Sequence, residues 1–189
     1  ADERGAGEPI VVYEAGNEVD EAWFVATMAQ QQIENGTAPK EIAVLYRENF
    51  QSRALEEAML HMDVPYRVLG TRFFQRKEVK DVLSYLRVAV NPKSRGDIAR
   101  IIAVPPRGIG KVTLDKMLEN KDAELPAAAK EKVGAFRASI AKIKHGIEML
   151  PASDAVAYAI EASGMQELYK KTDEGQERLE NMGELVNFA

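Results

Sequence analysis

The sequence has no cysteine and no long apolar run, and each absence excludes a class of protein. Without cysteine there is no disulfide framework and no thiolate metal site, which fits a reducing compartment. No apolar run approaches the roughly 18 residues that a membrane-spanning helix needs. The N-terminal residues ADERGAGEP are polar and acidic, unlike a signal peptide. For 189 residues we therefore expect a cytoplasmic globular protein of one or two domains.

The sequence also has no recognisable catalytic site. The nearest match to a phosphate-binding P-loop includes Lys111, but that pattern requires glycine where Pro105 stands and serine or threonine where Val112 stands. The two histidines, His61 and His145, are far apart in the sequence. No nucleophile motif and no metal-ligand spacing is present. We therefore expect no catalytic residue and no metal site in this chain.

The charge of the chain is unevenly distributed. The net charge is −5, yet residues 67–116 contain twelve Lys or Arg against four Asp or Glu, a local balance of +8. The remainder of the chain therefore carries −13. A basic segment in an acidic chain indicates a local anionic partner such as nucleic acid. A solvated basic surface without a partner would give the same count.

The apolar pattern predicts an α/β fold that becomes helical. Short apolar runs without alternation are typical of strands buried in a parallel sheet, and they occur at residues 10–13, 42–46 and 66–69. Helical spacing separates them, at residues 17–35 and 51–62. This order predicts a partial parallel sheet belonging to a larger α/β domain. After Gly70 no further strand is convincing, and helices are predicted at 76–90, from 97, after 113, and over 126–150, 151–164 and 165–189.

The first candidate binding segment follows the second predicted strand. Polar and cationic residues stand there, where open α/β sheets bind ligands. They are Arg47, Asn49, Gln51, Ser52 and Arg53. The arginines are suited to phosphates, and the other three to hydrogen bonds with a backbone or a base edge. An ordinary strand-to-helix loop, with a capping Asn49 or Ser52, remains the alternative.

The second candidate segment is a glycine turn. Its residues are Arg107, Gly108, Ile109, Gly110, Lys111 and Thr113. Two glycines permit a tight turn and a close approach of the backbone, Ile109 is expected to anchor the turn, and the following helix offers free N–H groups to a phosphate. Both glycines are expected to resist substitution by a β-branched residue. A plain helix-helix turn is the alternative.

These segments resemble one known family. LYRENFQSR, PYRVLGTRFFQRKEVKDVLSYLRVAVNP, RIIAVPPRGIGKVTLD and ERLENMGELV occur here in the order and at the spacing of the UvrD/PcrA/Rep group of superfamily 1 DNA helicases. The resemblance implies that residues 1–72 are part of the RecA-like motor domain 2A, with its incomplete parallel sheet, and that residues 73–189 are most of the helical accessory domain 2B. It implies single-strand contacts by residues 47–53, with Asn49 foremost, and duplex contacts by the glycine turn.

The resemblance also sets expectations for activity. It implies an ATP-dependent 3′-to-5′ DNA helicase of repair or replication, which uses ATP and Mg and works with motor and accessory domains 1A and 1B. The Walker motifs of the family are absent here, so the isolated chain is expected to bind neither ATP nor Mg and to be inactive. An incomplete sheet is also expected to self-associate. The alternative function is a non-catalytic protein-interaction module that regulates the helicase.

Overall fold

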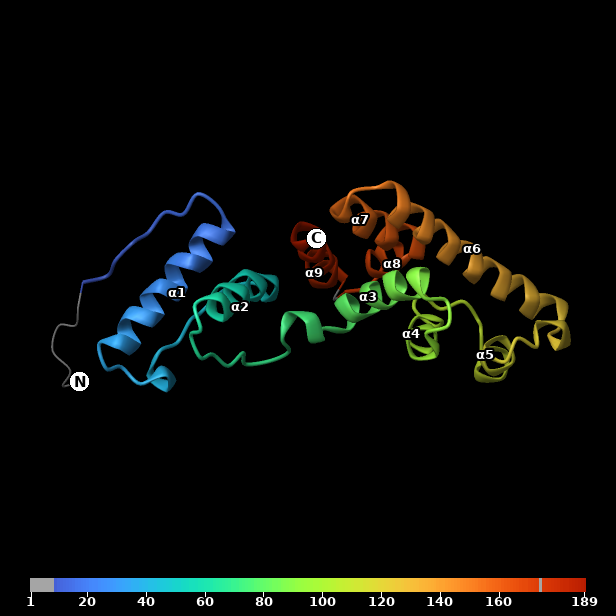
Figure 1. Ribbon diagram of the computed structural model, residues 1–189, viewed down its shortest axis with the longest axis horizontal. Coiled ribbons are helices and arrows are strands. Elements are labelled where there is room, and N and C mark those ends of the chain that lie inside the picture. Colours follow the sequence, from blue (N-terminus) through green and yellow to red (C-terminus); the bar gives the residue numbers. More distant parts are fainter. Residues whose placement is uncertain (1–8, 174) are drawn as a thin grey trace. The chain divides into compact units, whose positions relative to one another are not determined.

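The computed structural model describes residues 9–173 and 175–189. The chain divides into two compact units, Ala1–Val68 and Leu69–Ala189. Figure 1 follows the chain from the N-terminal helices α1 and α2 into the helices of the second unit. Each unit is described by itself.

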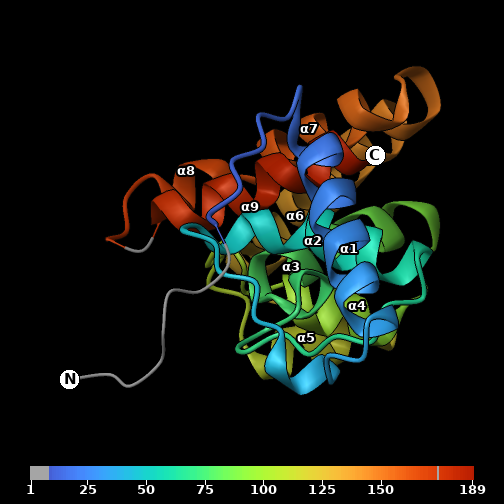
Figure 2. The same cartoon turned by 90° about the vertical axis from the view of Figure 1, so that its left-hand side faces the viewer.

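The first unit is built on a pair of helices, α1 (Glu18–Glu34) and α2 (Ser52–His61). Short 3-10 turns stand at Pro39–Glu41 and Asn49–Gln51. The side chain of Asn17 begins α1, because its Oδ1 accepts the backbone N–H groups of Val19 and Asp20 at 3.0 and 2.9 Å. The two helices, seen from their own side in Figure 2, pack through small side chains. This core contains Ala22, Ala26, Ala29, Ala54, Ala58, Met59 and Val64.

The prediction of a partial parallel sheet is wrong. The described residues contain no β-strand, and the runs at 10–13, 42–46 and 66–69 are irregular chain. Their side chains are largely uncovered: Ile10 is 94% exposed and Leu45 is 93% exposed. A strand exists only through backbone hydrogen bonds to a neighbouring strand. The apolar runs express a preference for burial, and within the described residues that preference is met only in part, by Ile42 and Tyr66, which pack against the core of the first unit.

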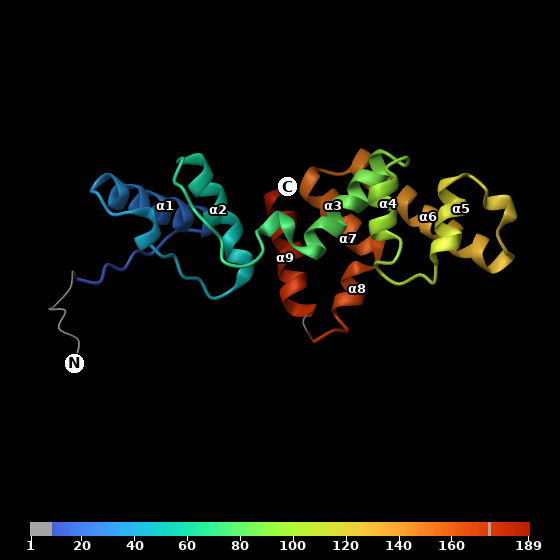
Figure 3. The same ribbon diagram turned by 90° about the horizontal axis from the view of Figure 1, so that it is seen from below.

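The second unit is helical, as predicted for the chain after Gly70. A 3-10 turn at Phe73–Gln75 leads into α3 (Lys77–Val90), followed by α4 (Arg95–Ile101), α5 (Lys111–Leu118) and a 3-10 turn at Asp122–Glu124. Next come α6 (Ala127–Met149), α7 (Ala152–Ser163), α8 (Met165–Tyr169) and α9 (Gly175–Phe188). Helix α3 is central: it packs on α4, α6, α7 and α9, and Val79, Val82 and Tyr85 are almost fully buried (Figure 3).

A buried polar network joins the start of α3 to α9. Arg76 Nη1 donates to Asn181 Oδ1 at 2.5 Å, and Asn181 Nδ2 donates to Glu78 Oε1 at 2.7 Å. Beside it, Arg100 Nε pairs with buried Asp81 Oδ1 at 2.7 Å. Removing one member of such a network would leave a buried polar group without its partner, so these contacts specify how α3, α4 and α9 pack.

Candidate nucleic-acid interface

The glycine turn lies between α4 and α5, and its two glycines differ in conformation. Gly108 has a positive φ of 64°, the left-handed region that glycine adopts without steric cost. Gly110 is extended, with φ −83° and ψ 173°, and is the N-cap of α5. Between them Ile109 is 8% exposed and belongs to the main core of the unit. The turn is therefore anchored in the core by one side chain and needs glycine at one position.

The N-terminus of α5 opens at this turn. No side chain caps it, and the first intrahelical bond runs from Leu114 N to Gly110 O at 3.0 Å. The preceding N–H groups of the helix have no intrahelical acceptor, and the helix dipole makes such an end favourable for an anion. Lys111 is exposed at the first helical position, and Thr113 is half-buried. Backbone donors and a cation thus occur together on the surface.

Arg107 points inward, away from this surface. Its Nη1 donates to Pro105 O at 2.9 Å and its Nη2 donates to Ser163 O at 2.8 Å. The guanidinium also lies over the rings of Tyr85 and Phe136, with its Cζ 5.7 and 5.6 Å from their centroids. These contacts occupy the fork of donors and tie the turn to α3, α6 and the end of α7. The side chain therefore positions the turn.

Tyr85 completes the support behind the turn. Its hydroxyl donates to Val104 O at 2.5 Å, and the ring is fully buried in the core. Burial raises the pKa of Tyr85 to about 12, which the nearby Arg107 guanidinium partly opposes. The phenol consequently remains a neutral donor at any physiological pH, and the chain before the turn is held firmly.

Lys132 also belongs to the surface around the glycine turn, although the sequence did not predict it. It comes from α6, and its Nζ donates to Gly108 O at 3.3 Å. A Cβ added to Gly108 would lie 2.8 Å from that same Nζ. Neither Lys132 nor Lys111 forms an ion pair among the residues that the structure describes. Two exposed cations, one predicted and one not, therefore belong to the surface around the turn.

The first candidate segment divides into exposed and buried residues. Arg47 and Asn49 are exposed. Gln51 has a local role, since its Oε1 accepts the backbone N–H groups of Arg47 and Glu48 at 3.1 and 2.9 Å. Its amide therefore holds the turn before α2.

The last two residues of that segment are buried. Ser52 is 1% exposed and Arg53 is 5% exposed. Arg53 Nη1 pairs with Glu57 Oε2 at 3.1 Å along α2. A ligand on the surface of this unit would therefore meet the side chains of Arg47 and Asn49 before those of Ser52 and Arg53.

Neither a metal-binding cluster nor a membrane-spanning helix occurs among residues 9–173 and 175–189. In these ranges no cluster of three or more His, Cys, Asp or Glu side chains could hold a metal ion. In the same ranges no helix has the length and apolar character needed to cross a membrane.

In the second unit the glycine turn leads into an uncapped helix N-terminus beside Lys111 and Lys132. Modules that bind an anionic backbone have these features. Comparison with known proteins identifies the family. All of residues 1–189 match the UvrD-like helicase C-terminal domain, and the chain belongs to that family.

Individual relatives agree with this assignment. DNA helicase II of Escherichia coli (strain K12) is 40% identical over 203 residues, covering 95% of this chain and 28% of the relative. DNA helicase II of Haemophilus influenzae is 38% identical over 200 residues, covering 95% of this chain and 27% of the relative. ATP-dependent DNA helicase PcrA of Staphylococcus epidermidis is 34% identical over 199 residues, covering 96% of this chain and 27% of the relative. The chain thus spans little more than a quarter of the length of these relatives.

Proposed function

We propose that this chain is a DNA-contacting part of an ATP-dependent DNA helicase. In this proposal residues 1–72 belong to motor domain 2A and residues 73–189 form most of accessory domain 2B. Membership of the UvrD-like helicase C-terminal domain family supports the assignment, as do relatives named DNA helicase II and PcrA. The whole protein would unwind DNA in the 3′-to-5′ direction in the cytoplasm during repair or replication.

The observation that carries the proposal is the surface of the glycine turn. Lys111, Lys132 and the uncapped N-terminus of α5 offer charge and backbone donors together. Such donors recognise phosphates and carry no base information, so they fit duplex DNA of any sequence. Gly108 allows the close approach, Ile109 anchors the turn and Arg107 positions it. Thr113, at the third position of α5, is a further candidate contact.

The single-strand contact is proposed for the segment before α2. Arg47 and Asn49 have the exposure that a direct contact requires. Ser52 and Arg53 would support the segment from inside, and Gln51 would hold its turn. Among these residues Asn49 is our first choice for a hydrogen bond to the strand.

The cofactors of the reaction belong to the whole helicase. ATP and Mg would be held largely by domain 1A, with 1B as its accessory domain, because this sequence contains neither Walker motif. We therefore propose that the isolated chain binds no nucleotide and hydrolyses none, while retaining its DNA contacts.

The experiment that tests the proposal compares two DNA forms with two variants. Fluorescence anisotropy measures the binding of a labelled duplex and of a labelled single strand at low salt. Lys111→Ala is expected to weaken duplex binding several-fold for every sequence and to leave single-strand binding nearly unchanged. Asn49→Ala is expected to do the reverse. Equal effects of both variants on both DNA forms would contradict the assignment of the two surfaces.

A further inference from the structure

A groove on the second unit lies outside both DNA surfaces. Its volume is about 550 Å³, within the range of sites that bind small ligands or single side chains. Its floor is apolar and comes from α3, α4, α5 and α6, whose arrangement Figure 3 shows. The floor residues are Val88, Ala89, Ile98, Met117, Phe136 and Ile140. None of them is a DNA contact in the function proposed above.

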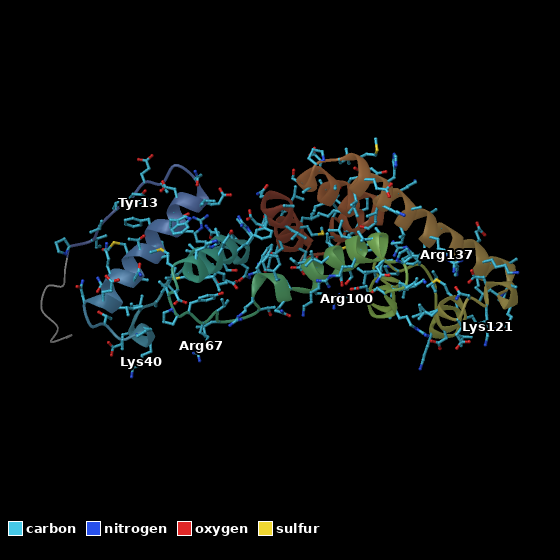
Figure 4. All side chains as sticks on the ribbon, viewed as in Figure 1. Tyr13, Lys40, Arg67, Arg100, Lys121 and Arg137 are labelled. Carbon is cyan, nitrogen blue, oxygen red and sulfur yellow. The ribbon has the colours of Figure 1, made fainter. Side chains whose placement is uncertain are left out.

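Four cationic side chains also line this groove, together with the neutral residues Pro92, Leu118, Asn120 and Ala141. Lys93 lines it from the connection before α4, Arg95 lines it as the first residue of α4, and Arg137 and Lys144 line it from α6. No Asp or Glu is among its lining residues. Figure 4 labels Arg137 on α6. An apolar floor between cationic walls is complementary to a ligand with an apolar centre and negative charge on either side.

The four cations differ in how strongly they are already engaged. Arg137 pairs with Asp122, which holds its guanidinium in place. Lys144 lies 3.8 Å from Glu148, an exposed i,i+4 pair that contributes little. Lys93 and Arg95 have no ion pair within the described parts of the chain. Lys93 is therefore available to a carboxylate of a ligand, whereas Arg95 already has an electrostatic interaction with Glu119 at a distance longer than an ion pair.

We propose that the groove binds an acidic peptide segment that carries one bulky apolar side chain. The apolar side chain would enter the floor beside Phe136 and Ile140, where burial of its surface is favourable. Carboxylates before and after it would meet Lys93 and Arg95 on one wall and Arg137 on the other. The proposal is independent of the DNA contacts and supplies a specific surface for a protein partner.

The floor favours a peptide over nucleic acid. Phosphate contacts are made by cations, hydroxyls, amides and backbone N–H groups, and a DNA backbone has no apolar side chain to place in the groove. The groove also requires a side chain that enters it, whereas a duplex presents its phosphates on a broad convex surface. The glycine turn, with its backbone donors, suits that surface better.

The experiment uses the chain itself and a synthetic peptide of Asp and Glu around a central Phe. Methyl NMR is expected to show shifts at Ile98, Met117 and Ile140 on titration. The same peptide with Gly in place of Phe is expected to bind at least about tenfold more weakly, as is a Lys-rich version with the central Phe. Absence of binding, shifts confined to other methyl groups, or equal binding of the Gly peptide would each overturn the proposal.

Charge-reversal variants then locate the acidic side chains. The double variant Lys93→Glu/Arg95→Glu is expected to weaken peptide binding about tenfold or more. Lys130→Glu/Lys142→Glu changes the net charge equally at exposed α6 positions outside the groove and is expected to have a much smaller effect. If both double variants lose the same peptide affinity, net charge alone explains the loss, and the proposed site is refuted. Duplex DNA that displaces the peptide and shifts the same methyl groups would assign the groove to nucleic acid instead.

Discussion

Replacing Arg107 by alanine tests whether this residue supports the glycine turn or grips DNA. By residue type alone it could be a phosphate contact. In the structure its guanidinium is committed to Pro105 O and Ser163 O at 2.9 and 2.8 Å and lies over two aromatic rings. The Arg107→Ala variant should therefore lose stability in the second unit, while DNA affinity should fall only to the extent that the turn is disordered.

The expected loss of unfolding free energy in Arg107→Ala follows from these contacts. A hydrogen bond from a charged group contributes about 1.5–3 kcal/mol, so losing two gives roughly 3–6 kcal/mol if they act nearly independently. The stability of a whole domain is about 5–15 kcal/mol, so a large share of it depends on this one side chain. For a unit of this size the loss corresponds to a fall in melting temperature of about 10 °C or more.

The assay is thermal and urea unfolding followed by two probes. Circular dichroism reports on both units, whereas fluorescence of the single tryptophan, Trp23 in α1, reports on the first unit. Arg107→Ala should lower the transition of the second unit and leave the fluorescence transition unchanged. Lys111→Ala is the matched control and should stay within about 0.5 kcal/mol of the parent, because Lys111 is exposed. Unchanged stability together with a salt slope reduced by about 0.9 would make Arg107 a phosphate contact and refute the reasoning.

Three further predictions concern the turn, the buried ion pair and the apolar surface. Gly108→Ala should destabilise the second unit by about 1–2 kcal/mol because of its positive φ, whereas Gly110→Ser should be neutral or slightly stabilising at an extended N-cap. Burial raises the pKa of Asp81, an effect that the Arg100 guanidinium opposes. Arg100→Ala should therefore destabilise the unit by about 2 kcal/mol at pH 7, and the deficit should shrink as the pH falls and Asp81 takes up a proton. The chain should self-associate with increasing concentration through its uncovered apolar segments, and Leu45→Lys should reduce this in light scattering without lowering stability.

Each of these predictions has a clear opposing result. Equal losses in Gly108→Ala and Gly110→Ser, measured by urea unfolding, would show that the positive φ is not the cause. A deficit in Arg100→Ala that stays constant as the pH is lowered from 7 through the range in which carboxyl groups take up protons would contradict the role given to Asp81. A strictly monomeric chain at high concentration would show that the uncovered segments do not drive association.

The helices of the second unit could be predicted closely because their signals are local. Helical spacing and Pro126 predicted residues 126–150, and α6 is Ala127–Met149. The prediction of 76–90 compares with α3 at Lys77–Val90, which ends before Asn91-Pro92. Apolar periodicity and helix-ending residues act within a few turns, so neighbours in the sequence determine them.

The absence of a sheet from the described residues could not be predicted, because strand pairing is not local. The run at 42–46 is as apolar as a buried strand, yet Leu45 is almost fully exposed and the run has no strand beside it in the described residues. Composition indicates that such a segment prefers burial, but only its neighbours decide whether it pairs. The same preference underlies the prediction of self-association.

The candidate interface was predictable in part. The sequence indicated the tight turn and the apolar anchor, and the positive φ of Gly108 and the burial of Ile109 agree with this chemistry. The inward direction of Arg107 was not predictable, since its acceptor Ser163 lies 56 residues further along the chain. Lys132 was missed for the same reason, because it reaches Gly108 from 24 residues away. Tertiary packing alone determines both contacts.

The central claim is that the surface around the glycine turn binds duplex phosphates. The most direct test is the slope of log K against log salt concentration for duplex binding, measured for the parent chain and for Lys111→Ala/Lys132→Ala. Each phosphate contact contributes about 0.9 to the magnitude of that slope, so the double variant should lower it by roughly 1.8 for every duplex sequence. An unchanged slope in a variant that remains folded by circular dichroism would contradict the claim.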